Sequence, residues 1–250
     1  MADAFPLFLP IAAKRLFQGE SLLRRIALTA RWTEASQLLE IYGSLGGLAL
    51  KEFLSCGLSV AEPQPAVVQF LSEKAQAIGA GERLVLRHMD PKDLDFSPGI
   101  FDGILSFGRI VGPVEELLRK WRPLLALHGR AGITLLARVG RQQGGPLVEY
   151  WNRRLGTAVP SIREALGVLE NEGFEPELVD CIGGSDLDAY YDEVEALLTD
   201  CECSDSEMSQ IREEIAVHRL HAANSNVAFA FAVARRKEPG EVPPASRDGG

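Results

Sequence analysis

The sequence has few cysteines and no long apolar run. Four cysteines stand among 250 residues, at positions 56, 181, 201 and 203. Such sparse cysteines suit a reducing cytoplasm rather than a secreted domain stabilised by disulfides, so we expect a cytoplasmic protein. No apolar run is long enough to cross a membrane. Residues 4–13 are apolar, but two prolines interrupt them and no basic leader precedes them, so we do not expect a signal peptide.

The cysteines also lack a metal-binding pattern. Cys201 and Cys203 form a single C-x-C in an acidic stretch, and a zinc site would need two further ligands. His218 and His221 lie three residues apart on the next expected helix and could supply them. Solvent-exposed loop cysteines are the favoured interpretation, and we expect no bound metal.

Positive charge is scarce as well. The sequence has 26 Lys and Arg residues against 35 Asp and Glu, which gives a formal net charge of −9. An acidic surface repels phosphate backbones, so broad nucleic-acid binding is not expected. Apolar residues make up 46% of the chain, an ordinary value for a globular protein. The length allows one large α/β domain or two small ones.

Short apolar runs alternate with helical patterns in the first two thirds of the chain. After a helical segment at 11–31, we predict strands at 37–41, 58–62, 83–88, 101–107 and 131–138. The helices between them are predicted at 47–56, 65–78 and 113–125. Strands that alternate with helices indicate a parallel, doubly wound sheet.

The last third breaks this alternation. A helix at 161–171 begins at Ser161, and Glu164 stands at the capping-box spacing. Gly173 ends this helix, and a strand follows at 174–179. Two acidic amphipathic helices at 187–198 and 206–223 precede a last apolar strand at 226–235. We therefore expect an N-terminal helical segment at 1–36, a main domain at 37–237 with a helical lid insertion at 185–224, and a disordered tail at 238–250.

A glycine-rich turn follows the first predicted strand. Residues 40–46 read Glu-Ile-Tyr-Gly-Ser-Leu-Gly, and a helix is expected directly after them. A strand, a tight glycine turn and a helix N-terminus together make a site for a ribose, a phosphate or a carboxylate. This turn is the first candidate for a cofactor pocket.

The order of these motifs resembles that of the class I S-adenosylmethionine (SAM) dependent methyltransferases, from about residue 18 to residue 237. The first motif of that family is an acid, an apolar residue and then Gly-x-Gly-x-Gly. Here Glu40 and Gly46 match the acid and the third glycine, whereas Tyr42 and Ser44 replace the first two glycines. The resemblance implies a Rossmann-like, doubly wound α/β sheet of seven strands in the order 3-2-1-4-5-7-6, with strand 7 antiparallel.

A nicotinamide-binding Rossmann domain is the nearest competing fold, since it also has a glycine turn and an acid after its second strand. The acid at Glu40 before the glycines favours the methyltransferase interpretation. The closing helix, strand, helices and strand of residues 161–235 favour it as well.

The resemblance implies SAM as the cofactor. Glu62 ends the second strand, where the family's acid holds the ribose hydroxyls, and Asp90 stands where an acid meets the adenine. Each could instead be structural, Glu62 as a strand end and Asp90 as a loop cap. The implied cofactor site comprises Glu40, Tyr42, Gly43, Ser44, Gly46, Glu62, Pro63, Asp90, Pro91 and Phe107.

A small-molecule acceptor is the expected substrate class. Methyl transfer is an in-line displacement that depends on positioning, and a base is needed only when the acceptor must lose a proton. No Asn-Pro-Pro-Tyr motif follows the fourth strand, and in this family a helical insertion before the last strand covers small acceptors. Arg109, Tyr150 and Trp151 are the substrate candidates, the last two as a lid after the glycine loop at 142–145. The sequence identifies no catalytic residue.

Further side chains and two alternative functions stay open. His88, Tyr190 and Tyr191 could lie at the pocket mouth or serve as structural contacts. The two acidic helices could also form a homodimer interface, whereas no membrane partner is expected. The chain could be an inactive methyltransferase-like binding or scaffold subunit, with the Tyr42 ring in the old pocket. It could also be a different nucleotide-binding enzyme on a similar sheet.

Overall fold

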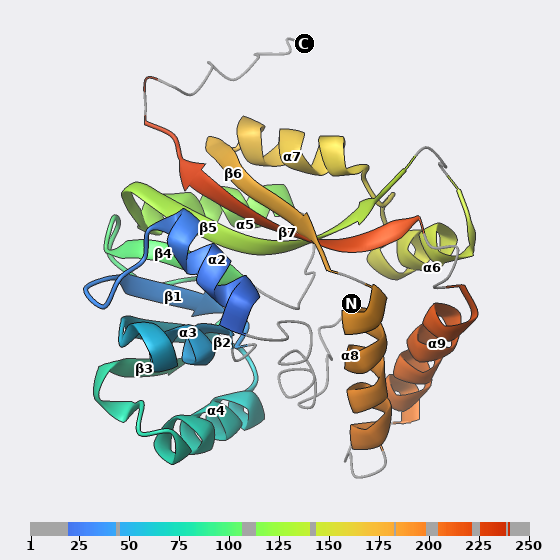
Figure 1. The fold of residues 1–250 in the computed structure, drawn as a ribbon, viewed down its shortest axis with the longest axis horizontal. Helices are drawn as coiled ribbons and strands as arrows, with labels where there is room; N and C mark the ends of the chain where they lie inside the picture. Colours follow the sequence, from blue (N-terminus) through green and yellow to red (C-terminus); the bar gives the residue numbers. More distant parts are fainter. Residues whose placement is uncertain are drawn as a thin grey trace.

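A seven-stranded sheet forms the centre of the molecule (Figure 1). The computed structural model describes residues 20–43, 46–106, 114–140, 144–182, 184–198, 205–221, 226–238 and 240. The sheet order is β3-β2-β1-β4-β5-β7-β6, and β7 runs antiparallel to both of its neighbours. The predicted order and the antiparallel last strand are therefore confirmed. The strands are β1 (Gln37–Ile41), β2 (Gly57–Glu62), β3 (Leu84–His88), β4 (Phe101–Ser106), β5 (Leu125–Arg138), β6 (Phe174–Cys181) and β7 (Val227–Arg236).

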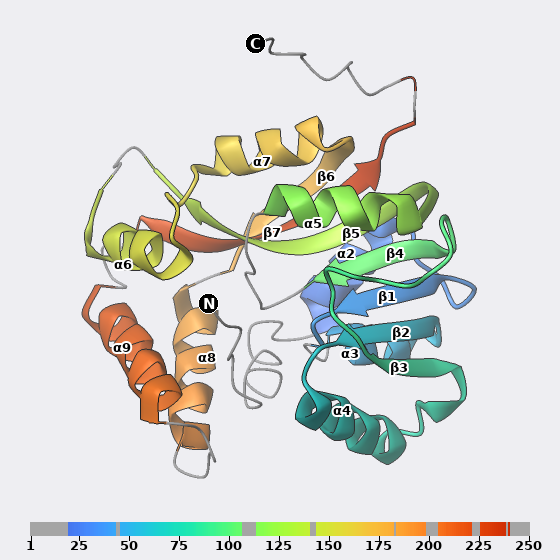
Figure 2. The same cartoon turned by 180° about the vertical axis from the view of Figure 1, so that it is seen from behind.

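Helices cover both faces of the sheet (Figure 2). One apolar layer joins the sheet to α2 (Glu20–Ala30), α3 (Gly46–Leu54) and α4 (Pro65–Ala77), and also includes α8 (Gly184–Leu197) and α9 (Asp205–His221). The opposite layer contains α5 (Val114–Trp121) and α7 (Ile162–Asn171), and α6 (Pro146–Leu155) has a smaller cluster of its own. Short 3-10 turns span Gly81–Arg83 and Arg122–Leu124. None of the described helices is long and apolar enough to span a membrane.

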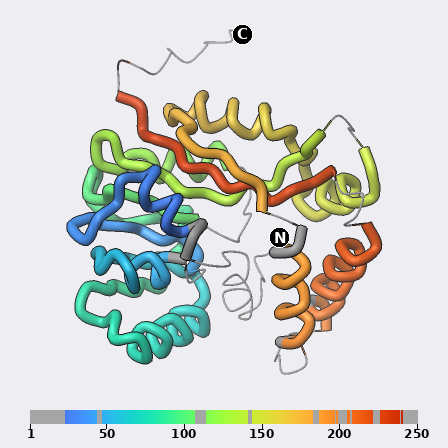
Figure 3. Tube along the Cα trace, viewed as in Figure 1, coloured from blue at the N-terminus to red at the C-terminus, as the bar shows by residue number. Residues whose placement is uncertain are grey.

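The last strand shows why the sheet can bury both of its faces. In β7, Phe231 and Val233 belong to the α2 side, whereas the alternating alanines 230, 232 and 234 belong to the α5–α7 side. Side chains of a strand point to opposite faces in turn. The large and small residues therefore face different helical layers, as the sequence pattern predicted for a strand between two layers. Figure 3 shows β7, in red, running between β5 and β6.

Two predicted elements have different bounds in the structure, and one helix was not predicted. β5 begins at Leu125 rather than at residue 131, and it contains His128. The backbone of His128 has φ +62°, and the register between β4 and β5 shifts here, so an irregular segment precedes the regular strand. The helix predicted to reach residue 125 ends at Trp121, because Pro123 favours the 3-10 turn. Helix α6, which begins at Pro146, was not predicted.

The predicted capping box is confirmed at α7. The Ser161 hydroxyl accepts a hydrogen bond from the Glu164 N–H at 3.3 Å, and the Ser161 N–H donates to the Glu164 carboxylate at 2.6 Å. Gly173 follows the helix with φ +84°, and a Cβ there would lie 2.4 Å from a guanidinium nitrogen of Arg122. A glycine is therefore required where the chain turns from α7 into β6.

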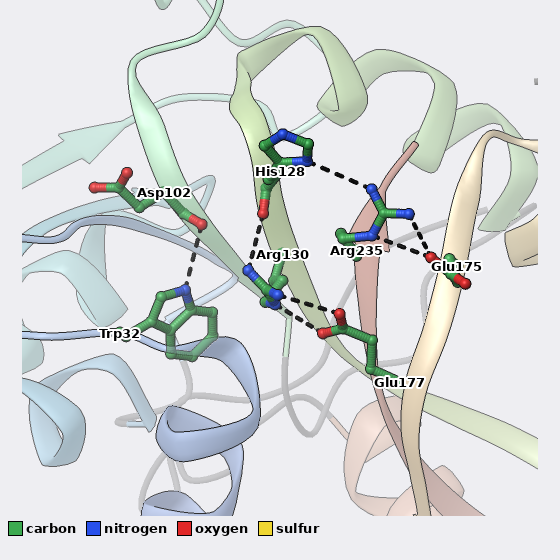
Figure 4. A network of polar contacts seen from close by, with 7 residues as sticks. All are labelled: Trp32, Asp102, His128, Arg130, Glu175, Glu177 and Arg235. Atoms are coloured by element: carbon green, nitrogen blue, oxygen red, sulfur yellow. Dashed lines mark hydrogen bonds and ion pairs between the residues drawn. The ribbon is translucent and has the colours of Figure 1, made fainter. Parts of the chain in front are cut away.

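Charged side chains join strands at the amino-terminal edge of the parallel strands (Figure 4). Arg130 on β5 donates two hydrogen bonds to Glu177 on β6, at 2.7 and 3.1 Å, and Arg235 on β7 pairs with Glu175 on β6. Near the start of β4, the Trp32 indole N–H donates to the Asp102 carbonyl at 3.3 Å. These contacts hold the sheet together at the edge opposite the candidate site.

Candidate functional site

The carboxyl edge of the parallel strands gathers the predicted site residues. Strands β1 to β5 are parallel, and β6 has the same direction because β7 is antiparallel to both β5 and β6. The turns after β1, β2 and β3 therefore share this edge with α6 after β5, α8 after β6 and α9 before β7 (Figure 1). In open α/β sheets, ligands bind at the carboxyl ends of the strands. The edge has two halves, one formed by the β1–β3 turns and one by the three helices.

Tyr42 takes the backbone conformation of a glycine. Its φ is +59°, in the left-handed region that glycine adopts without penalty, and its N–H donates to the Ala61 carbonyl at 3.0 Å. The side chain is 5% exposed and belongs to the apolar layer that includes Ile41 and Ala61. The turn thus has a buried ring at a position whose backbone conformation favours glycine.

The glycines around this turn are sterically required. A Cβ on Gly43 would lie 2.3 Å from Leu71 Cδ1, and a Cβ on Gly47 would lie 2.8 Å from Glu40 Oε2. Glu40 itself is fully buried. Gly46 is the first residue of α3. Gly47 was not among the predicted site residues, although the close approach of α3 to β1 depends on it.

Glu62 connects the turns after β1 and β2. Its Oε2 accepts a hydrogen bond from the Gly43 N–H at 3.0 Å, and its Oε1 accepts one from the Gln64 N–H at 2.8 Å. The side chain is 2% exposed. A carboxylate has about four lone-pair sites, so it can accept hydrogen bonds from several donors at once. Beside it, the Pro63 carbonyl lies 2.9 Å from His88 Nε2.

The turn after β3 is fixed by its own backbone. Asp90 is exposed. Its Oδ1 accepts a hydrogen bond from the Lys92 N–H at 2.8 Å, and its backbone carbonyl accepts one from the Asp93 N–H at 2.9 Å. The buried Pro91 offers its carbonyl to the Trp121 indole N–H of α5 at 3.2 Å. Asp90 thus caps its own loop, one of the two interpretations that the sequence left open, and its side chain is exposed.

Tyr150 and Trp151, the proposed lid residues, lie on helix α6. Both side chains are buried, and their rings meet edge to face with centroids 5.2 Å apart. Trp151 packs in the same way on Phe229 of β7. The Tyr150 hydroxyl is buried and has no hydrogen-bond partner among the described residues. Of the glycine loop predicted at 142–145, only Gly144 and Gly145 are among the described residues, and α6 begins directly after them.

Helices α8 and α9 add a polar cluster to the same half of the edge. The Tyr191 hydroxyl donates to Glu214 Oε1 at 3.0 Å, and the Tyr190 ring packs edge to face on Tyr191 at 5.0 Å. The His218 ring lies 4.3 Å from the Tyr191 ring, and its Nε2 is 2.9 Å from Asp188 Oδ1. Tyr190 and Tyr191 are thus buried interhelix contacts, one of the two interpretations that the sequence left open.

Burial changes the acidity of this cluster. Burial raises the pKa of Glu214, and this effect outweighs the hydrogen bond from Tyr191 and the charge of Arg154. Burial also raises the pKa values of Tyr150, Tyr190 and Tyr191, and the negative charge of Glu214 adds to each increase. Glu214 was not a predicted site residue, because nothing in the sequence distinguishes it from the other carboxylates of its helix.

Three predicted site residues, Ser44, Phe107 and Arg109, lie outside the described residues, as do Cys201 and Cys203. Within the described ranges, no group of three His, Cys, Asp or Glu side chains could hold a metal ion.

Comparison with known proteins identifies the fold by structure alone. No family model matches the sequence, and no curated protein is similar to it. A proposed sarcosine dimethylglycine methyltransferase from Galdieria sulphuraria has a TM-score of 0.70 at 13% identity, covering 87% of this chain and 84% of that one. A phosphoethanolamine N-methyltransferase 2 from Haemonchus contortus, in complex with S-adenosylhomocysteine, has a TM-score of 0.69 at 13% identity, covering 92% and 57%.

A third similar structure is the [4+2]-cyclase SpnF, with a TM-score of 0.67 at 16% identity, covering 87% of this chain and 80% of that one. The chain therefore has the fold of the class I SAM-dependent methyltransferases. Because a cyclase shares that fold, the fold does not by itself determine the reaction.

Proposed function

We propose that the protein is a SAM-dependent methyltransferase that acts on a small molecule. The observation that carries this proposal is the buried carboxylate of Glu62, which receives the Gly43 N–H at the carboxyl edge of β1 and β2. A carboxylate fixed in this way is an acceptor for the two hydroxyls of a ribose. The fold and the residue types at this half of the edge agree with such a cofactor.

The residues around Glu62 fit SAM by their chemistry. Glu62 would accept hydrogen bonds from the ribose hydroxyls, and the exposed Asp90 would meet the adenine amino group. The turn of Tyr42 and Gly43, together with the start of α3, would face the methionine part. SAM supplies an electrophilic methyl group when it is bound. The chain then has to hold the acceptor nucleophile in line with it and to exclude water.

The half of the edge formed by α6, α8 and α9 is the proposed acceptor side. In the similar structures, the names and ligands are those of small-molecule enzymes, which supports a small acceptor here. We propose the main domain at 37–237, with α8 and α9 as its lid, and a cytoplasmic location in line with the few cysteines. No catalytic residue is assigned.

An inactive methyltransferase-like binding protein is the second candidate, and the observation that favours it is the Tyr42 side chain where the family has glycine. Calorimetric titration with SAM and S-adenosylhomocysteine separates the two candidates. We expect micromolar dissociation constants for both ligands, and methyl transfer from labelled SAM to a member of a metabolite panel. No heat at millimolar SAM would support the inactive protein. Binding of a nicotinamide cofactor instead would indicate a different enzyme.

A further inference from the structure

Three tyrosines and one glutamate meet where α6, α8 and α9 pack together. Tyr150 comes from α6, Tyr190 and Tyr191 from α8, and Glu214 from α9. The Tyr191 hydroxyl donates to Glu214 Oε1 at 3.0 Å. Helix α6 is joined to α9 one turn after Tyr150, where Arg153 pairs at 2.7 Å with Glu213, the neighbour of Glu214. We call these four residues the tyrosine site.

The tyrosine site has unused hydrogen-bonding capacity. Tyr150 is 4% exposed, and its hydroxyl has no hydrogen-bond partner among the described residues. Among the described residues, Tyr191 is the one hydrogen-bond partner of the Glu214 side chain, and no ion pair includes Glu214. Buried polar groups in folded proteins are normally hydrogen-bonded. A buried phenol without a described partner and a carboxylate with one hydrogen bond, on two helices that pack together, could both contact a ligand.

Two arginines of α6 have partners other than Glu214, and the guanidinium of Arg153 also lies 5.8 Å from the centroid of the Tyr150 ring. Arg153 pairs with Glu213 at 2.7 Å, and Arg154 donates to the Gln210 side chain. The charge of Arg154 lowers the pKa of Glu214 but does not offset the effect of burial. On the far side of the Tyr191 ring, His218 is bonded to Asp188. The site thus needs a cation that can donate hydrogen bonds.

A protonated amine has the required chemistry. An ammonium group donates up to three hydrogen bonds and accepts none. It can donate to Glu214 and to the Tyr150 oxygen at once, and tyrosine ring faces attract cations. An alcohol could satisfy Tyr150 but would leave the carboxylate charge uncompensated. We propose that the tyrosine site binds the protonated amine of the acceptor. This assignment rests on the proposed function, since it places the acceptor under the three helices.

Titration with small amines tests this inference on the full chain. The probes are n-butylamine and benzylamine at neutral pH, each matched with its alcohol, and the readouts are calorimetry and the fluorescence of Trp151, which contacts Tyr150. We expect the amines to bind at millimolar concentration, at least about tenfold more tightly than the alcohols. Glu214→Gln should weaken amine binding about tenfold or more, whereas the neighbouring Glu213→Gln should change it less than about twofold.

Tyr150→Phe separates a binding role from a structural one. It removes only a hydroxyl without a partner, so the folded protein should be no less stable. Amine affinity should nevertheless fall about threefold or more. A purely structural Tyr150 would leave the affinity unchanged and would contradict the inference. The same conclusion follows if alcohols bind as tightly as amines, if Glu214→Gln binds amines normally, or if a crystal grown with benzylamine has only a water molecule at the site.

A separate SAM titration distinguishes the two proposals. If SAM binds and neither amine binds, the tyrosine site is wrong and the methyltransferase proposal stands. If the amines bind in a Glu214-dependent way and SAM does not, the methyltransferase proposal is wrong and the amine site stands.

Discussion

The N–H of Gly43 and the carboxylate of Glu62 are joined by a buried hydrogen bond of 3.0 Å. This single contact fixes the turn after β1 against the end of β2. It gives Glu62 two roles, one in holding the turn and one in the proposed contact with the cofactor.

Glu62→Ala should therefore weaken both folding and cofactor binding. Two backbone N–H groups lose their acceptor, which should lower the free energy of unfolding by about 1–3 kcal/mol. The SAM dissociation constant should rise about tenfold or more. Urea denaturation and calorimetry measure the two effects, and Glu73→Ala on the exposed face of α4 is the control. An unchanged SAM affinity in the folded variant would remove the main support for the cofactor assignment.

Tyr42→Gly should destabilise the protein without creating a cofactor site. Loss of the buried ring should lower the free energy of unfolding by about 3–5 kcal/mol. Glycine adopts the left-handed backbone conformation without strain, which should raise it by about 1 kcal/mol. Because the ring packs among core residues, SAM affinity should change less than about threefold, alone or combined with Ser44→Gly. Tyr42→Phe is the control for the hydroxyl. If SAM binds only to the double variant, Tyr42 blocks the pocket and the native protein is the inactive form.

Two tyrosines of the tyrosine site should respond in opposite directions to the same substitution. Tyr150→Phe removes a buried hydroxyl without a partner and should raise the free energy of unfolding by about 1 kcal/mol. Tyr191→Phe removes a hydrogen bond to a carboxylate and should lower it by about 1.5–3 kcal/mol. Urea denaturation of both variants measures the difference. Equal effects would mean that the Tyr150 hydroxyl has a partner in solution.

Because the pKa of Glu214 is raised, the difference in stability between the Glu214→Gln variant and the native protein should depend on pH. The folded state holds this proton more tightly than the unfolded state, whose pKa is near the ordinary 4.5. The contribution of Glu214 to stability is therefore full below pH 4.5 and falls as the pH rises through the higher folded pKa. Glu214→Gln cannot ionise, so its stability relative to the native protein should increase with pH across this window. Denaturation curves from pH 4 upward measure it, and a constant difference would contradict the assignment.

The capping box of α7 gives a local prediction. Ser161→Ala should lower the free energy of unfolding by about 1 kcal/mol, because the Glu164 N–H loses its acceptor. Ser161→Asp should keep most of the stability, since aspartate is an equally good N-cap. Thermal denaturation compares the two variants, and an unchanged melting temperature for Ser161→Ala would show that the cap contributes nothing.

The sequence predicted the sheet because the central strands β1, β2 and β4 carry apolar runs that are almost entirely buried. Every predicted strand occurs, and the order followed from the resemblance of the motifs. Helix α6 was missed because Gly144 and Gly145 indicated a loop, and the helix begins directly after them at Pro146. The first part of β5 was missed because His128 and Gly129 interrupt the apolar pattern, whereas a left-handed residue allows the strand to continue through them.

The candidate site was predictable only where a motif identifies a position. Glu62 and the turn at Tyr42 follow from their places after β1 and β2. Glu213 and Glu214 are adjacent acids in an acidic helix, and helix packing decides that Glu213 is exposed whereas Glu214 is half-buried. Whether the Tyr150 hydroxyl has a hydrogen-bond partner likewise depends on how α9 packs against α6, which no sequence motif indicates.

The position of β7 has a consequence for how the chain is made. A ribosome synthesises β5, α6, β6, α8 and α9 before β7, yet β7 is the strand that joins β6 to β5. Until β7 emerges, β5 has an open edge and β6 has no described strand beside it. The half of the sheet that carries the acceptor helices therefore closes last, after most of the chain has left the ribosome. A chain that terminates before residue 227 would keep the strands proposed to bind the cofactor but would expose the β5 edge to other chains.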